Sequence, residues 1–329
     1  MDHGVGSSDH SKLRRMIVDG VNKLIKLPDS VFEQAIVETI IILIKSINDN
    51  NEIEGVVFKN DDKLELNSIP FSIFRRNAFK ADEECRFNIF SNPLFTSIIE
   101  KMKNDSRDLY SYVETSLGIT PYDKYKGHDE ATIKGRKFHS ATKLDDTYVP
   151  LISGANISRY YISDSVEEYL KYGNWLGAPR ERRFFDGNNI VVRQILSGEN
   201  LGIIAGLSET PQFFTQIGFS LLDRNNDLEE LKVLLAILNS KLMTFYHKNV
   251  FLDTEKKVFP KILIANAKKF PIKMPFDKSE IVELVNQILC FKKSNPSAVT
   301  SALESKIDSL VYQLYGLTED EIKIVEGEE

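Results

Sequence analysis

Cysteine is scarce in this chain of 329 residues, which contains only Cys85 and Cys290. Two thiols so far apart along the chain form no disulfide framework, and they are too few for a structural zinc site. We expect both to be small buried apolar residues of a protein in a reducing compartment, the cytoplasm. Tryptophan is scarcer still, because Trp175 is the only one.

Long hydrophobic runs are also lacking. The most apolar stretch, residues 36–47, contains Glu38 and Lys45, and it is shorter than the ~20 apolar residues that span a bilayer. Residues 1–10 have no apolar core, so they do not read as a secretory signal, and we expect a disordered lead there. The sequence therefore predicts a protein with no membrane partner.

Charge is nearly balanced overall but unevenly distributed. The 42 basic and 48 acidic residues give a net charge of −6, and the 42% hydrophobic content is typical of a globular chain of about two domains. Residues 241–275 contain eight lysines and two acidic residues, whereas residues 276–329 contain five lysines and eleven acidic residues. Such asymmetry is expected where one surface meets a polyanion.

Recognisable catalytic patterns are absent as well. The five histidines are scattered without metal-ligand spacing, and no nucleophile elbow or glycine-rich phosphate loop follows a strand. Asp253 and Glu255, followed by two lysines, resemble the acid–acid–lysine triad of metal-dependent nucleases, but a solvated charged loop is the favoured interpretation. We therefore predict no catalytic residue, cofactor site or metal site in this chain.

Hydrophobic periodicity predicts helices mixed with strands. We expect helices over 11–25, 91–104, 227–249, 278–294, 296–317 and 318–327. We expect strands over 35–46 (buried), 53–59 and 108–119, and then five short strands between 148 and 222. A long loop is expected over 118–147. Pro296 should begin the penultimate helix, Gly316 should end it, and Thr318 should cap the last one.

Residues that suit nucleic acid gather in three places. Residues 175–185 combine Trp175 with arginines at 180, 182 and 183, whose guanidinium forks suit phosphates and guanine edges. The alternative is that Trp175 is a core residue and that these arginines pair with Glu181 and Asp186. Further along, Arg193 and Gln194 should point to opposite faces of a strand, so that one reads DNA and the other lines the core.

The third place is the segment 121–139, where aromatic residues alternate with basic ones. This mixture can embrace a DNA backbone, although a mobile surface loop has a similar composition. The residues concerned are Tyr122, Lys124, Tyr125, Lys126, Lys134, Arg136, Lys137 and Phe138.

Several segments taken in order carry a family resemblance between residues 105 and 325. They are GITPYDKYKG, YVPLISGANISRYYI, YGNWLGAPRERRFFDGNNIVVRQI, LLAILNSKLMTFYH, FPKILIANAKKFPI and IDSLVYQLYGLTEDEIKIVEG. Together they resemble the C-terminal half of type IIG restriction–modification enzymes and related N6-adenine DNA methyltransferases. In that family a TaqI-like specificity domain follows the methylase domain.

The resemblance implies an α+β (mixed α/β) fold with methylase-remnant strands, a mixed-sheet DNA target-recognition domain and a C-terminal helical hairpin. Residues 11–60 resemble the end of a methylase catalytic domain, 61–275 the target-recognition (specificity) domain and 276–329 a helical tail. The family's Asn-Pro-Pro-aromatic motif is not matched, because Leu94 replaces the second proline in SNPLF. The glycine-rich loop for S-adenosylmethionine is missing, so no catalytic or cofactor-binding residue is carried over.

The implied function is recognition of double-stranded DNA, with a methylase catalytic domain in cis or trans as partner. Such an enzyme extrudes its adenine and needs a second lobe that grips the duplex. S-adenosylmethionine would belong to the parent enzyme, as would Mg²⁺ if that enzyme also cleaves DNA. A homodimer through exposed strand edges is a further expectation. The alternatives are a methyltransferase subunit that acts with a separate cofactor-binding chain, and a protein-interaction module of a phage-defence complex.

The predicted DNA-binding residues are those that could contact phosphates or base edges. They are Lys124, Lys126, Arg136, Lys137, Arg159, Trp175, Arg180, Arg182, Arg183, Arg193, Gln194, Lys248, Lys256, Lys257, Lys261, Lys268 and Lys269.

Overall fold

A computed structural model describes residues 10–28, 31–32, 39–45, 51–58, 69, 71–82, 84–89, 93–196, 202–251 and 261–327. The chain divides into two compact units, unit 1 (Met1–Glu100) and unit 2 (Lys101–Glu329). This division lies later than the domain boundary expected after residue 60, because strands on both sides of that position share one sheet. Residues 1–9 of the lead expected over 1–10 lie outside the described residues, as do Lys256 and Lys257.

Unit 1 is built on a four-stranded sheet in the order β2-β1-β3-β4, in which β1 and β3 are parallel and the other pairs antiparallel. Its core contains Leu24, Ile53 and Phe74. The elements are α1 (Ser11–Ile17), β1 (Val21–Lys26), β2 (Ile40–Ile44), β3 (Glu52–Val57), β4 (Ser72–Arg75) and α2 (Arg76–Ala81).

The helix predicted over 11–25 is wrong beyond Ile17, where the chain turns and enters β1. Val21 and Leu24 are both fully buried, and their spacing of three residues imitates a helix. A bulge between Val21 and Lys23 shifts the strand register, which explains how two residues three apart can share the core-facing side of one strand. The spacing is therefore a consequence of the bulge.

The strand predicted within 35–46 exists as β2, but the prediction that it is buried is wrong. The side chains of Ile41, Leu43 and Ile44 are 42%, 45% and 54% exposed, because β2 is an edge strand of its sheet. An exposed apolar edge of this kind is the feature on which the expected homodimer depends, and that homodimer stays a prediction.

The described residues of unit 2 form three sheets. A five-stranded sheet has the order β6-β14-β11-β12-β9, a four-stranded sheet the order β13-β8-β10-β7, and β15 pairs with β5. The strands are β5 (Arg107–Asp108), β6 (Val113–Leu117), β7 (His139–Ser140), β8 (Tyr148–Ile152), β9 (Tyr160–Tyr161), β10 (Glu168–Lys171), β11 (Asn189–Arg193), β12 (Ala205–Ser208), β13 (Phe213–Phe214), β14 (Gly218–Asp223) and β15 (Pro271–Ile272).

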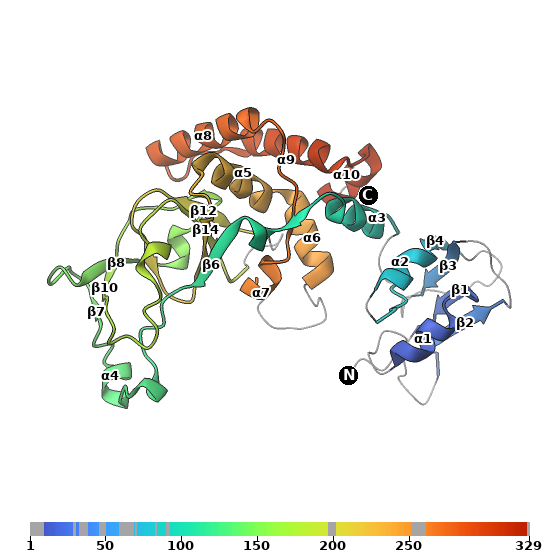
Figure 1. The fold of residues 1–329 in the computed structure, drawn as a ribbon, viewed down its shortest axis with the longest axis horizontal. Coiled ribbons are helices and arrows are strands. Elements are labelled where there is room, and N and C mark those ends of the chain that lie inside the picture. The colour runs from blue at the N-terminus through green and yellow to red at the C-terminus, as the bar shows by residue number, and fades with distance from the viewer. Residues whose placement is uncertain are drawn as a thin grey trace. The chain divides into compact units, whose positions relative to one another are not determined.

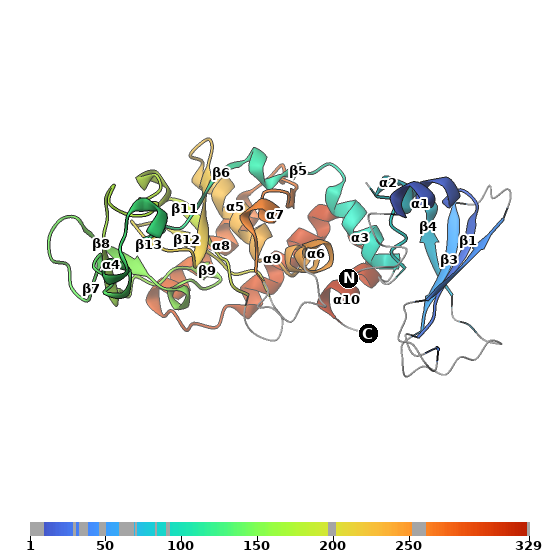
Figure 2. The ribbon, with the colours of Figure 1, turned by 90° about the horizontal axis from the view of Figure 1, so that it is seen from below.

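Helices cover one side of this sheet structure. Helix α5 packs on the five-stranded sheet, α8 packs beside α5, and α9 packs beside α8. Helices α4 and α7 lie on the side away from α8 and α9 (Figures 1 and 2). The α-helices are α3 (Pro93–Lys103), which crosses the division between the units, and α4 (Glu130–Lys134), α5 (Leu228–Asn239), α6 (Lys241–Phe251), α7 (Ile264–Ala267), α8 (Ser279–Ser294), α9 (Ser301–Tyr315) and α10 (Glu319–Glu326).

The single helix predicted over 227–249 is wrong, because Ser240 adopts an extended conformation (φ −65°, ψ 152°) that separates α5 from α6. The Ser240 hydroxyl donates to the carbonyl of Ile237 and accepts from the amide of Met243, so it serves both helix ends. The first amide of α6, on Lys241, is capped by Asp308 at 2.9 Å. The local Ser240 hydroxyl and the distant Asp308 carboxylate thus satisfy backbone groups that the break leaves without helical partners.

Most local signals in the rest of unit 2 are confirmed. Gly316 ends α9 with φ +69°, and Thr318 forms a capping box at the start of α10. Helix α9 begins at Ser301, however, five residues after the start predicted at Pro296. The sequence did not predict β10 or β13. Of the two cysteines, Cys85 is buried as predicted, whereas Cys290 is exposed.

No helix within the described ranges is long and apolar enough to cross a membrane.

Candidate nucleic-acid interface

One end of the five-stranded sheet brings together polar residues from three segments of unit 2. Arg193, the last residue of β11, pairs with Gly218 at the start of β14. The amide of Gln194 donates to the carbonyl of Ile217 at 2.8 Å, and its carbonyl accepts from Ile262 at 2.9 Å. A backbone bridge between Ile195 and Lys261 extends this pairing.

Strand β6 ends at the same place, and two side chains from later in the chain contact the residues that follow it. The amide of Gly118, directly after β6, donates to Gly218 at 3.2 Å. Arg180 lies with its Nε 3.5 Å from the carbonyl of Gly118, and Gln216 donates from Nε2 to the Thr120 hydroxyl at 2.8 Å. We call the set Arg180, Arg193, Gln194, Gln216 and Lys261 the sheet-end surface.

The sheet-end surface is accessible and positively charged. Arg180, Gln216 and Lys261 are exposed, and Arg193 and Gln194 are half-buried. The expectation that either Arg193 or Gln194 lines the core is therefore wrong. Within the described part of the chain none of its three cations forms an ion pair with a carboxylate. Arginine forks fit the O6 and N7 atoms of guanine, and glutamine amides fit the N6 and N7 atoms of adenine.

Arg180 has an unusual backbone. Its φ of +64° lies in the left-handed region. A residue other than glycine adopts this conformation at a cost of about 1 kcal/mol. Residues held in such conformations are concentrated at binding and catalytic sites, where the strain places a side chain. This geometry separates Arg180 from the two arginines that follow it in the sequence.

Arg182 and Arg183 are engaged in ion pairs. Arg182 contacts Asp186 at 3.0 Å, and Arg183 contacts Glu181 at 2.7 Å and holds Glu114 with two bonds of 3.0 and 2.6 Å. The bonds from Arg183 lower the pKa of the Glu114 carboxyl. Glu114 lies near the start of β6, at the far end of that strand from Gly118. The alternative interpretation, pairing with Glu181 and Asp186, is therefore confirmed for these two arginines.

Trp175 is not a core residue, since 42% of its surface is exposed. Its indole Nε1 donates to the carbonyl of Lys171 at 2.9 Å, and the Lys171 ammonium lies 5.2 Å from the ring centroid. The Trp175 carbonyl lies 2.8 Å from His128 Nε2, which joins this segment to residues 122–139.

The basic residues of 122–139 differ in their partners. Arg136 is paired with Glu168 at 2.8 Å, and Lys134 is paired with Glu130 within α4. Lys126 and Lys137 are exposed, and among the described residues no ion pair is recorded for either. The Lys124 ammonium lies 4.9 Å from the centroid of the Tyr125 ring.

The lysines of 241–275 are more dispersed than the sequence suggested. Lys241 forms an ion pair with Glu326, and burial lowers the pKa of Lys248. The Lys268 ammonium lies 4.8 Å from the centroid of the Tyr110 ring, and Lys269 is exposed. Of this group, the structure places Lys261 in the sheet-end surface.

The comparisons with known proteins bear directly on these segments. Residues 149–272 match the TaqI-like C-terminal specificity domain. The predicted resemblance is confirmed over this range, which we call the specificity domain. It contains Arg180, Arg193, Gln194, Gln216 and Lys261, the whole sheet-end surface.

Solved structures of restriction–modification proteins are similar at low sequence identity. The type IIG restriction endonuclease BpuSI is 10% identical with a TM-score of 0.42, covering 94% of this chain and 45% of that one. The type IIL enzyme MmeI in complex with DNA is 9% identical (TM-score 0.37), covering 94% and 43%. The HsdS subunit from Thermoanaerobacter tengcongensis is 9% identical (TM-score 0.34), covering 68% and 50%. This chain spans half or less of their lengths, and no curated protein sequence matches it.

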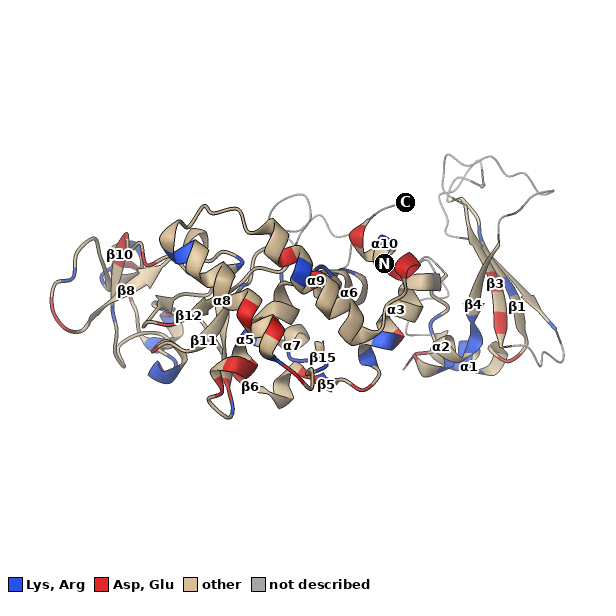
Figure 3. Cartoon of the chain, turned by 90° about the horizontal axis from the view of Figure 1, so that it is seen from above, with Lys and Arg blue, Asp and Glu red and all other residues tan. Residues whose placement is uncertain are grey.

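The acidic helical tail braces the specificity domain through ion pairs. Arg159 contacts Glu304 of α9 at 2.7 Å, which gives this predicted DNA-binding residue a structural partner. Asp308 of α9 caps α6, and burial raises the pKa of this carboxyl to about 6. Acidic positions are also visible on α5 and around α10 in Figure 3. Acidic residues of the tail thus stabilise the helix structure that carries part of the basic segment 241–275.

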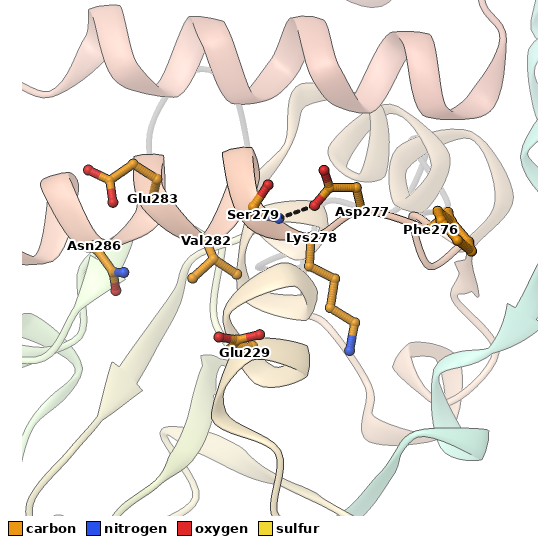
Figure 4. A pocket seen from close by; sticks show the side chains of 8 residues that line it. All are labelled: Glu229, Phe276, Asp277, Lys278, Ser279, Val282, Glu283 and Asn286. Carbon is orange, nitrogen blue, oxygen red and sulfur yellow. Dashed lines mark hydrogen bonds between the residues drawn. The ribbon is translucent and has the colours of Figure 1, made fainter.

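An open cavity of about 410 Å³ lies at the first turns of α5 and α8 (Figure 4). Its lining is Glu229, Phe276, Asp277, Lys278, Ser279, Val282, Glu283 and Asn286. Lys278 is the one cation of this lining, and it is shared between the carboxylates of Asp227 and Glu230. The acidic residues of the lining therefore give the cavity a negative charge, which disfavours phosphate. None of the predicted DNA-binding residues lines it. Among the described residues no cluster of three metal-ligating side chains is found.

Gln216 is the member of the sheet-end surface that sequence reasoning missed. Its place depends on Thr120, which lies 96 residues earlier in the chain. No local pattern around residue 216 indicates this contact.

Proposed function

We propose that this chain recognises a specific sequence in double-stranded DNA, as the specificity part of an adenine-specific DNA methyltransferase of the type IIG restriction–modification class. The observation that carries the proposal is the match of residues 149–272 to the TaqI-like specificity domain. The accessible cations and amides of the sheet-end surface support it, because they lie within that range and suit base edges.

Each residue of the sheet-end surface has a role that its chemistry supplies. Arg180 and Arg193 would read guanine, Gln194 and Gln216 would read adenine, and Lys261 would bind a phosphate. Phosphate contacts release counterions, so affinity that depends on them falls steeply as salt rises.

The test is the equilibrium affinity of the full chain for a mixed-sequence duplex at several salt concentrations. We expect log Kd to rise linearly with log salt, with a slope that reports the number of phosphate contacts. An affinity that does not change with salt would contradict the proposal. Single-stranded DNA of the same sequence serves as the competitor that shows whether the duplex is preferred.

Catalysis would come from a methylase catalytic domain in cis or trans, which binds S-adenosylmethionine. Mg²⁺ would serve a cleavage step of the same parent enzyme. The supporting observation is that SNPLF departs from the family's motif at Leu94. Titration of this chain alone with S-adenosylmethionine in a calorimeter should give no binding heat. Saturable binding would contradict the division of labour between the two parts.

A further inference from the structure

Residues 122–139 form a projection with an aromatic centre of its own, at the end of unit 2 where α4 lies (Figure 1). The rings of Tyr122 and Phe138 stack with centroids 5.2 Å apart and an interplanar angle of 10°. The Tyr122 hydroxyl accepts from the Phe138 amide at 2.9 Å and lies 2.8 Å from His139 Nδ1. We call this segment the aromatic projection, and its contacts fix its conformation.

The tip of the aromatic projection is fixed in turn to the specificity domain. The Asp123 carboxylate accepts from the Tyr125 amide at 2.9 Å and caps the short turn Lys124–Lys126, which ends at Gly127 with φ +87°. The Asp123 amide donates to His128 Nδ1 at 3.0 Å, so Nε2 carries the proton and donates to the carbonyl of Trp175 at 2.8 Å. The tip is therefore held from both sides.

This rigid support presents an exposed aromatic ring between two cations. Tyr125 is 86% exposed, and its neighbours Lys124 and Lys126 are exposed as well. A tyrosine on a fixed backbone loses little conformational entropy when it makes a contact. An apolar ring flanked by two ammonium groups matches the chemistry of the duplex backbone, in which a sugar lies between two phosphates.

We propose that Tyr125 packs against a sugar of the backbone of duplex DNA while Lys124 and Lys126 bind the flanking phosphates, which supplies affinity that does not depend on sequence. This inference rests on the proposed function and assigns a separate role to a second surface. Every nucleotide presents a sugar and a phosphate, so contacts of this kind hold the duplex without reading it. Reading is left to the sheet-end surface.

The test compares the full chain with single variants on the same mixed-sequence duplex, by fluorescence anisotropy. We expect Tyr125→Ala to weaken binding about 5-fold, whereas Tyr125→Phe keeps the ring and should bind as the wild type does. Phe276→Ala is the matched control, because Phe276 is a fully exposed aromatic that lines the acidic cavity at α5 and α8, so its loss should not change Kd.

The phosphate contacts have a separate measurement. Lys126→Ala should lower the slope of log Kd against log salt by about 1, whereas the control Lys306→Ala, an exposed lysine of α9, should leave it unchanged. Thermal unfolding should be the same for Tyr125→Ala as for the wild type, because the side chain is exposed.

The outcomes separate the two proposals. Suppose that wild-type affinity falls with salt but Tyr125→Ala binds the duplex as tightly as the wild type does. This result overturns the role of the aromatic projection and leaves the proposed function standing. The same holds if Tyr125→Ala loses binding only for particular sequences. A wild-type chain that binds no duplex overturns both.

Discussion

Asn239 joins helix α5 to strand β12 through its side-chain amide. The side chain is fully buried. Its Oδ1 accepts from the Ala205 amide at 3.1 Å, and its Nδ2 donates to the carbonyls of Ala205 at 2.9 Å and Leu235 at 3.1 Å. The Ala205 amide therefore has this side chain as its acceptor, whereas the Ala205 carbonyl also lies beside β9, which pairs with β12.

Replacing Asn239 by alanine leaves the Ala205 amide buried without its acceptor and removes one bond to the Ala205 carbonyl. An unsatisfied buried group costs about 1–3 kcal/mol and a lost hydrogen bond about 1 kcal/mol, and the better helix propensity of alanine offsets about 0.5 kcal/mol. We expect Asn239→Ala to lower the free energy of unfolding by about 2 kcal/mol. Urea unfolding followed by far-UV circular dichroism and by the fluorescence of Trp175 measures this change.

The matched control is Asn249→Ala in the next helix. Asn249 is exposed, and its amide bonds only to the carbonyl of Phe245, one turn earlier in α6. We expect this variant to change the free energy of unfolding by less than about 0.5 kcal/mol. Equal effects of the two substitutions would refute the reasoning that Asn239 completes the hydrogen bonding of β12.

Three further predictions follow from single residues. Burial lowers the pKa of His247 to about 4, so the unfolded chain binds a proton near pH 6.5 while the folded chain does not. Stability should therefore fall by roughly 3 kcal/mol as pH drops from about 7 to about 4, and His247→Leu should remove this component from unfolding curves measured across that range. Arg180→Gly should raise the free energy of unfolding by up to about 1 kcal/mol, because glycine tolerates φ +64°, and should weaken DNA binding in anisotropy titrations; a variant that is less stable would contradict the strain. Arg183→Ala should leave DNA affinity within about two-fold and cost less than about 1 kcal/mol in urea unfolding, since exposed ion pairs contribute little; a large loss of affinity would show that its pairing with Glu114 is broken on DNA.

The parts of the fold that were predicted from the sequence depend on neighbouring residues. Gly316 at a helix end and Thr318 three residues before a glutamate act within one turn of the backbone, and both are confirmed. The strands around β8, β11 and β14 carry their own apolar residues, so their existence was predictable as well.

The parts that were mispredicted depend on contacts between distant residues. The bulge in β1 and the helix break at Ser240 are stabilised by pairing with β2 and by Asp308, and neither partner is adjacent in sequence. The arginine-rich segment is a similar case. Arg183 forms an ion pair with Glu114, which is 69 residues away, whereas Arg180 has no carboxylate partner among the described residues. No local sequence pattern distinguishes the two arginines.

We propose that the sheet-end surface reads DNA sequence. The decisive experiment is selection of bound duplexes from a random library by the wild-type chain and by the double variant Arg193→Ala and Gln194→Ala. We predict that the wild type enriches a defined consensus and that the double variant still binds duplex but loses preference at particular positions of it. A wild type that enriches no consensus, or a double variant that enriches the same one, would show that this surface does not read sequence.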